Sequence, residues 1–286
     1  MSRVAEQLIT GSAPVRRRPK ATLLIGIVLT GLIVLMALVS LFWLPYPLAD
    51  TSGGRLEGPS ALHLLGTDRL GRDLLSQLMW GARIALVVGT CAVAIAAVLG
   101  TIVGLLAAFA RPWVDDTLSA GLDVVIAFPV LLLAMLVVAV QGASLWSAVL
   151  AIGLAMSAVV ARLTRILARR VLQEQYITAA RTSGTGVLGV VFQHVLPNIA
   201  PTLAVSLALQ FGAAVLAEAS LSYLGLGAPP PNASWGRMLQ EAQGTVLTAP
   251  VGAIAPGVAI IALVLGVNFL ADGLRDLADP TRRRSR

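Results

Sequence analysis

Long stretches without a charged residue dominate the chain and alternate with short polar segments. These charge-free windows cover residues 22–44, 84–110, 124–161, 182–217 and 242–271. A helix needs about 20 apolar residues to cross the hydrocarbon core of a bilayer, at a rise of about 1.5 Å per residue. Each window is therefore long enough to hold at least one membrane-spanning helix.

Two of the windows contain polar interruptions, and these set the predicted number of spans at six. The third window is too long for one span and is broken by the polar segment QGAS at 141–144. The fourth holds a polar, glycine-containing stretch up to residue 194, so its span should begin near Val195. The pattern predicts an all-α integral membrane protein with six transmembrane helices, at about 22–44, 84–110, 118–140, 145–167, 195–217 and 250–271.

Composition supports the membrane assignment. The 286 residues are 57% hydrophobic and only 12% charged, and the mean hydropathy is +0.86. Soluble domains carry about 25% charged residues. This difference excludes an ordinary soluble domain.

The placement of basic residues predicts the orientation of the spans. An even number of spans puts both termini on one side, and cytoplasmic loops retain lysine and arginine. Of the 21 lysine and arginine residues, only five then fall on the opposite side, namely Arg55, Arg69, Arg72, Arg83 and Arg237. We therefore expect both termini and the 171–194 loop in the cytoplasm. The net charge of +7 follows from this topology, and nucleic acid is not expected as a partner.

The spans divide the chain into four parts. Residues 1–20 form a predicted cytoplasmic tail, and residues 21–83 hold the first transmembrane helix and an external segment. Residues 84–271 form a five-helix core that includes the 171–194 loop, and residues 272–286 form a second cytoplasmic tail.

Residues for common catalytic and metal sites are scarce. The single lysine, Lys20, does not stand in the sequence G-x-x-x-x-G-K-[ST], so the chain cannot build a phosphate-binding P-loop. The zinc motif H-E-x-x-H is absent from the sequence as well. The only histidines are His63 and His194, and the only cysteine is Cys91. We expect no catalytic residue, no metal site and no cofactor within this chain.

The 171–194 loop is predicted to form a rigid elbow between two spans. Residues 171–183 contain no glycine or proline and predict about three helical turns. Ala179 and Ala180 are small enough for a partner to approach the backbone closely. Gly184 suits the left-handed conformation that ends a helix, and a second short helix is expected at 187–194.

After the elbow, Pro197 permits a fresh helix start, because a first-turn position needs no amide donor. Such an elbow can pass force from a soluble partner to the membrane helices. The alternative is an ordinary amphipathic loop at the membrane surface.

The segments TAARTSG and HVLPN, at 178–184 and 194–198, resemble the EAA loop of ABC-importer permease subunits. That pattern is E-A-A, three variable residues and G, followed by L-P after apolar residues. The chain departs from it at Thr178, where the family usually has a glutamate that contributes polar contacts to the ATPase. The resemblance implies that the ATPase docks on Thr178, Ala179, Ala180, Arg181, Gly184, Val195, Leu196 and Pro197.

Three further segments are similar to those of the C-type permeases for dipeptides, oligopeptides and nickel, and they occur in the family's order. They are LGTDRLGRDLLSQLMWGARIALVVG at 65–89, EASLSYLGLGAPPPNASWGRML at 218–239 and DGLRDLADP at 272–280. In the second segment, the resemblance implies that Pro229, Pro230, Trp235 and Gly236 face a binding protein. Trp235 also suits the headgroup region.

The resemblance implies a type I importer fold in a prokaryotic plasma or inner membrane. A second homologous permease would complete a heterodimer, so that this chain lines half of the translocation pathway. Two cytoplasmic P-loop ATPase domains would bind ATP and Mg. An extracytoplasmic binding protein would deliver the substrate, for which short peptides are expected.

Several charged residues and prolines leave alternatives open. In GTDRLGRD, Asp68 and Asp73 alternate with Arg69 and Arg72, which fits an interfacial cap held by ion pairs or a substrate contact. Prolines within predicted spans can kink them; these are Pro129, Pro201 and Pro256.

Two acids near predicted span ends, Asp123 and Glu218, are candidates for gating or for pairing between helices. If they relay protons instead, the chain is a secondary transporter or channel that works without ATP. The small number of intramembrane acids argues against that reading, and a membrane-embedded enzyme has weaker support still.

Overall fold

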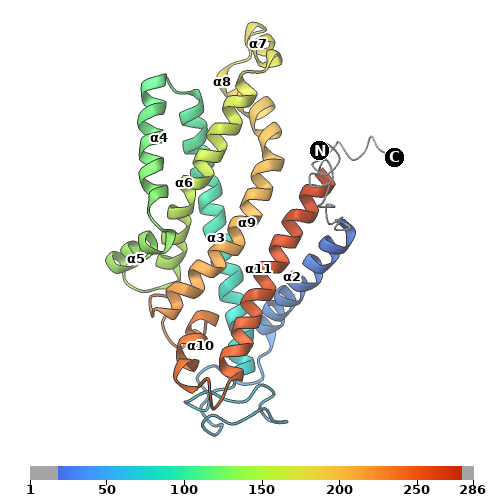
Figure 1. Ribbon diagram of the computed structural model, residues 1–286, viewed down its shortest axis with the longest axis vertical. Coiled ribbons are helices and arrows are strands. Elements are labelled where there is room, and N and C mark those ends of the chain that lie inside the picture. The colour runs from blue at the N-terminus through green and yellow to red at the C-terminus, as the bar shows by residue number, and fades with distance from the viewer. Residues whose placement is uncertain (1–18, 279–286) are drawn as a thin grey trace, which may run out of the picture.

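The structure of this protein is a computed structural model that describes residues 19–278, and this part of the chain is mostly helical (Figure 1). The predicted tails extend beyond it, at residues 1–18 and 279–286. Among the described residues the only β-type pairing is an isolated bridge between Thr67 and Asp73. The helices are α2 (Pro19–Phe42), α3 (Leu74–Phe109), α4 (Pro112–Ala127), α5 (Val130–Gln141), α6 (Leu145–Leu172), α7 (Gln175–Thr182), α8 (Val187–Gly189), the π-helical η1 (Val190–Val195), α9 (Leu196–Tyr223), α10 (Trp235–Ala242), the 3₁₀ turn η2 (Gln243–Thr245) and α11 (Val251–Ala278).

Within residues 19–278, five helices are long and apolar enough to cross a membrane, and the bent pair α4–α5 could supply a sixth. The five are α2, α3, α6, α9 with the segment before it, and α11. They confirm five of the predicted spans, but α3 begins at Leu74 instead of near residue 84. The earlier start has a local cause, because the Asp73 side chain accepts a hydrogen bond from the Ser76 amide and caps the helix.

The span predicted at 118–140 is broken in two, and the break stands at Pro129, one of the prolines expected to kink a span. Helices α4 and α5 meet at an angle of 90°, and α5 lies across the bundle (Figure 1). The break falls at Phe128 and Pro129, where Phe128 has an extended backbone. A proline disfavours helical geometry in the residue before it and cannot donate an amide hydrogen bond. Pro201 and Pro256, by contrast, lie inside the continuous helices α9 and α11.

Helix α3 packs most extensively against α6, and glycines allow the close approach. A Cβ atom at Gly100 would lie 2.5 Å from Cβ of Val160, and one at Gly104 would collide with the Ala161 carbonyl. Without water to drive association, membrane helices rely on such small residues for close van der Waals contact. The main apolar cluster surrounds this pair and includes side chains of α5 and α9.

A second layer consists of α2 packed along α11, and α9 joins the two layers because it contacts α3, α6 and α11 (Figure 1). Helices α7 and α8 project from one end of the bundle, where α2 starts and α11 ends (Figure 1). Helix α10 and residues 43–73 lie at the opposite end. The two ends therefore carry different loops, and each holds one group of candidate site residues.

Candidate functional site

The 171–194 loop departs from the predicted single helix over 171–183. Helix α6 runs on to Leu172, and α7 starts only at Gln175, because the backbone of Glu174 is extended. The prediction for Gly184 is confirmed: its φ is +90°, in the left-handed region. The amide of Gly184 donates to the Arg181 carbonyl at 3.1 Å, and the turn ends α7 as expected for a glycine after a helix.

Ile177 is the buried residue of α7 and packs in the main apolar cluster, and the Tyr176 ring lies 6.0 Å from the ring of His194. The predicted docking residues Thr178, Ala179 and Arg181 are exposed, and Ala180 is half-buried. The α7 surface that the sequence singled out is thus open to a partner.

Pro197 stands in the first turn of α9, as predicted, since α9 begins at Leu196. The chain before it is already helical, however, because η1 runs up to Val195. The π-helical η1 joins α8 to α9, and the Leu196 amide donates to the Val191 carbonyl. Of the three predicted docking residues here, Val195 is buried, Leu196 is half-buried and only Pro197 is exposed. Val195 therefore packs inside the bundle instead of contacting a partner.

Sequence reasoning missed an exposed apolar surface beside α7. Leu188 is 72% exposed and Phe192 is 65% exposed, and Val187 and Tyr176 are exposed as well. The spacing of Leu188 and Phe192 at i and i+4 was the available signal, since these positions share a helix face. Clustered apolar side chains in a polar loop are typical of a protein contact.

Below the loop, α4 and α6 are joined by ion pairs. Asp115 of α4 is 2% exposed and receives Arg165 on both carboxylate oxygens, at 2.5 and 2.6 Å. Arg169 donates to the same carboxylate at 2.5 Å. Asp115 was not among the candidate residues that the sequence indicated.

The two acids proposed for gating have different surroundings. Asp123 is largely exposed and forms an ion pair with Arg162 of α6. Glu218 of α9 is 2% exposed and accepts a hydrogen bond from Ser222 at 2.6 Å. Asp123 thus links α4 to α6, whereas Glu218 is held by a residue of its own helix, and a gating role for either acid remains a prediction.

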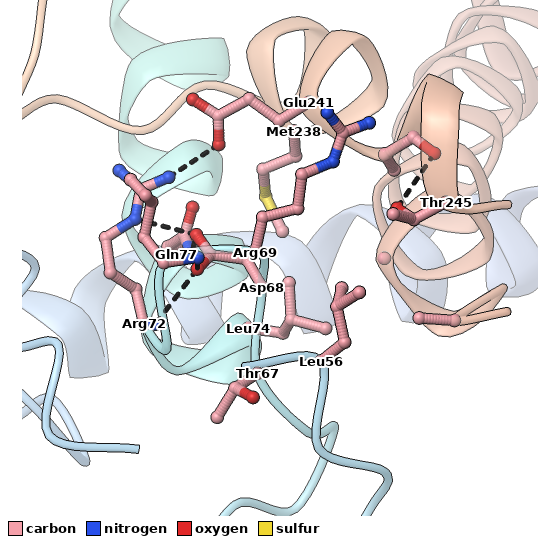
Figure 2. A pocket seen from close by; sticks show the side chains of 14 residues that line it. Leu56, Thr67, Asp68, Arg69, Arg72, Leu74, Gln77, Met238, Glu241 and Thr245 are labelled. Atoms are coloured by element: carbon pink, nitrogen blue, oxygen red, sulfur yellow. Dashed lines mark hydrogen bonds and ion pairs between the residues drawn. The ribbon is translucent and has the colours of Figure 1, made fainter. Parts of the chain in front are cut away.

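At the opposite end, the GTDRLGRD segment builds a charged network around a cavity of about 220 Å³ (Figure 2). Asp68 accepts from Arg72 at 2.7 Å and from Gln77 at 3.0 Å, and Arg72 also donates to Glu241 of α10 at 2.6 Å. The expected local pairing is confirmed for these two residues. Asp73 is different, since it pairs with His63 at 3.0 Å and caps α3.

Arg69 is the cation in this cavity without an ion pair among the described residues. Its side chain extends past Met238 toward Gly244, and Leu74 lines the cavity on another side (Figure 2). The cavity therefore offers an apolar wall and one uncompensated positive charge.

The external loop proposed to face a binding protein divides into exposed and buried residues. Pro229 and Pro230 are exposed. Trp235 is 1% exposed, and its indole donates to the Leu78 carbonyl at 3.0 Å while its ring packs on Gly81, so the prediction that it lies in the headgroup region is wrong. Gly236 is buried against the Ala219 backbone.

The helical bundle, its polar elbow and the order of its motifs define a membrane transport subunit. Residues 100–284 match the family described as "Binding-protein-dependent transport system inner membrane component". The chain belongs to this family of ABC-importer permeases. It is a multi-pass transmembrane permease subunit of an ATP-driven importer, and this membership argues against a secondary transporter or channel.

The alignments with curated relatives cover most of this chain and most of each relative. A protein named "Dipeptide transport system permease protein DppC", from Alkalihalophilus pseudofirmus, is 38% identical over 90% of this chain and 85% of its own length. "Glutathione transport system permease protein GsiD" from Pectobacterium atrosepticum is 39% identical over 88% of this chain and 86% of its own. "Di/tripeptide transport system permease protein DppC" from Pseudomonas aeruginosa is 39% identical over 89% and 86%.

Proposed function

We propose that this permease carries short peptides into the cell as one half of a heterodimer with a second, homologous permease. The observation that carries the proposal is the set of relatives above, whose names specify dipeptides, di- and tripeptides, and glutathione, itself a tripeptide. The identity of 38–39% with these relatives holds over about nine tenths of the chain.

We place the 171–194 loop and both termini in the cytoplasm, where two P-loop ATPase domains would bind ATP and Mg. The support comes from the arginine distribution and from the exposed residues of α7 and α8. Arg181 would supply a polar contact at this interface, and Leu188 and Phe192 an apolar one. Since the chain has no P-loop sequence, the energy for transport comes from these partners.

Coupling follows from how α7 is connected. It is joined to α6 by Gln173 and Glu174 alone, and to α9 through the turn at Gly184 and the helical segment that follows. Closure of the ATPases would displace α7 and with it the ends of two spans. Because Asp115 binds α6 to α4, a displacement of α6 would move α4 as well.

At the other end, we propose that the cavity beside Arg69 receives a carboxylate side chain of the extracytoplasmic binding protein. An exposed guanidinium next to apolar walls suits such a group, because charge-assisted hydrogen bonds are stronger than neutral ones. Arg69→Ala should then weaken binding of the loaded binding protein, which can be measured by surface plasmon resonance on the assembled complex.

The experiment that tests the proposed function is purification of the tagged chain from its native membrane, followed by mass spectrometry and reconstitution in liposomes. We expect a second permease and P-loop ATPases to copurify, and labelled dipeptide uptake to require ATP and the binding protein. Recovery of this chain alone, still able to move solute without ATP, would overturn the proposal.

A further inference from the structure

Polar side chains recur at every fourth position along the first half of α9. They are Asn198, Thr202, Ser206 and Gln210. Asn198 and Thr202 are exposed, and Ser206 and Gln210 are half-buried, because an i+4 row drifts around a helix by about 40° per step. The row therefore winds from the surface of the bundle toward its interior.

The Asn198 side-chain amide donates to the His194 carbonyl at 2.6 Å, but the other three polar side chains are poorly satisfied by the chain itself. Among the described residues, the hydroxyls of Thr202 and Ser206 make no hydrogen bond, although such groups in helices often donate to the carbonyl four residues earlier. The Gln210 side-chain nitrogen is buried and has no partner either. A polar group left without a partner in hydrocarbon is costly, so this surface is not built for lipid.

Other exposed faces of the bundle differ in composition. On α2 the exposed side chains include Leu24, Val28 and Leu32, and on α11 they include Val258 and Ile261. These faces are apolar, as expected for contact with acyl chains. The polar row on α9 thus marks a different environment from that of its neighbours.

Two members of the row, Thr202 and Ser206, also line a hollow. A groove of about 490 Å³ is bounded by Leu163 of α6, by α9 from Pro201 to Leu209, and by Arg275 of α11. Its volume lies within the range of about 300–1,000 Å³ that is typical of small-molecule sites. None of the described residues that line it is acidic. Arg275 lies in the last turn of α11, and α11 ends at the end of the bundle from which α7 and α8 project (Figure 1).

We propose that this groove is the surface that the chain contributes to the peptide pathway, with Thr202 and Ser206 hydrogen-bonding to the peptide backbone. Arg275 receives the carboxylate of the peptide as it leaves toward the cytoplasm. Uncharged hydroxyls suit a zwitterionic cargo, since they can donate to carbonyls and accept from amides without holding either end tightly. This inference rests on the proposed function and specifies the residues that carry it out.

Cysteine accessibility in the assembled complex tests the groove. Starting from a Cys91→Ala parent, we compare Ser206→Cys with Val28→Cys on the apolar face of α2. A charged methanethiosulfonate reagent should modify Ser206→Cys at least about tenfold faster, because only a hydrated thiol ionises and reacts. Added alanyl-alanine should slow the modification, and modification should block uptake.

The outcomes separate the groove from its alternatives. If Ser206→Cys is as unreactive as Val28→Cys, the row is packed against another subunit and the inference fails. If it reacts but alanyl-alanine gives no protection, the groove is wet without being the peptide path, and the inference fails as well. If the parent complex, with its ATPases assembled, takes up no peptide, the proposed function fails whatever the labelling shows.

Arg275 gives a second, independent measurement. Arg275→Gln should lower the efficiency of alanyl-alanine uptake about tenfold, because a charge-assisted hydrogen bond to the carboxylate is lost. Arg275→Lys retains the charge and should recover most of the uptake. Equal uptake by Arg275→Gln and the parent would remove Arg275 from the pathway.

Discussion

At the scale of single residues, Gly184 and Asp115 each determine the local structure, one through its backbone and the other through its side chain. Gly184 has a positive φ, yet a Cβ there would meet nothing within 4 Å. Its requirement for glycine is therefore purely one of backbone conformation. Asp115 is the opposite case, because its backbone is ordinary helix and its side chain holds two arginines.

Gly184→Val should uncouple transport from ATP hydrolysis. A β-branched residue at positive φ costs about 1–3 kcal/mol, which is enough to change the turn after α7. The measurement is peptide uptake per ATP hydrolysed in liposomes. Gly186→Val is the matched control, since Gly186 has a φ of −69° and equally open surroundings. Equal coupling in the two variants would show that the turn conformation is dispensable.

Asp115→Asn should lower the stability of the chain by about 1.5–3 kcal/mol, because hydrogen bonds to charged groups are worth that much and Arg165 and Arg169 lose their carboxylate. The measurement is the midpoint of thermal unfolding in detergent. Asp116→Asn, at the exposed neighbouring position, should leave the midpoint nearly unchanged. A similar shift for both variants would contradict a specific role for Asp115.

At the scale of helices, the contact between α3 and α6 depends on glycine. Gly104→Val should destabilise the bundle by about 1–3 kcal/mol, because the new side chain collides with the α6 backbone at Ala161. Thermal unfolding in detergent checks this. Gly121→Val in α4 is the control, since a Cβ at Gly121 meets nothing within 4 Å. A Gly104→Val protein as stable as the control would mean that the two helices separate easily.

The apolar windows predicted the helices well wherever a span is straight. They failed at α4–α5, because a proline within a span does not say whether the helix breaks: Pro129 stands at a 90° break, whereas Pro201 and Pro256 lie in continuous helices. The difference arises from packing, since α5 lies against α6, and no local pattern encodes that contact.

The parts of the candidate site that depend on neighbouring residues in the sequence could be predicted, and the parts that depend on contacts between distant segments could not. Gly184 could be placed because the left-handed turn depends on the residue itself. Asp115 pairs with Arg165 and Arg169, which are 50 and 54 positions further along the chain, so this pairing depends on how α4 packs against α6. The burial of Trp235 depends on its contact with Gly81, so it follows from the position of α10 beside α3.

At the scale of the whole molecule, the two ends of the bundle carry the two proposed sets of partner surfaces, and the side of the membrane on which each end lies can be measured. In a Cys91→Ala background, Ala61→Cys should react with a membrane-impermeant maleimide on intact cells or spheroplasts. Ser183→Cys, beside Gly184, should react only after permeabilisation, because the arginine distribution places that loop inside. The reverse pattern would invert the topology and with it the assignment of the ATPase end.

The unbroken helical run from Val187 to Tyr223 comprises 37 residues. At a helical rise it is about 55 Å long, against a hydrocarbon thickness of about 30 Å. The bilayer surrounds the middle of this helical run, so the run can tilt about its middle and both of its ends then move. A tilt of about 10° displaces one tip relative to the other by about 10 Å for such a rod. A small tilt imposed at Leu188 would therefore cause a large sideways displacement of the other end of the run, beside α10, where cargo would enter.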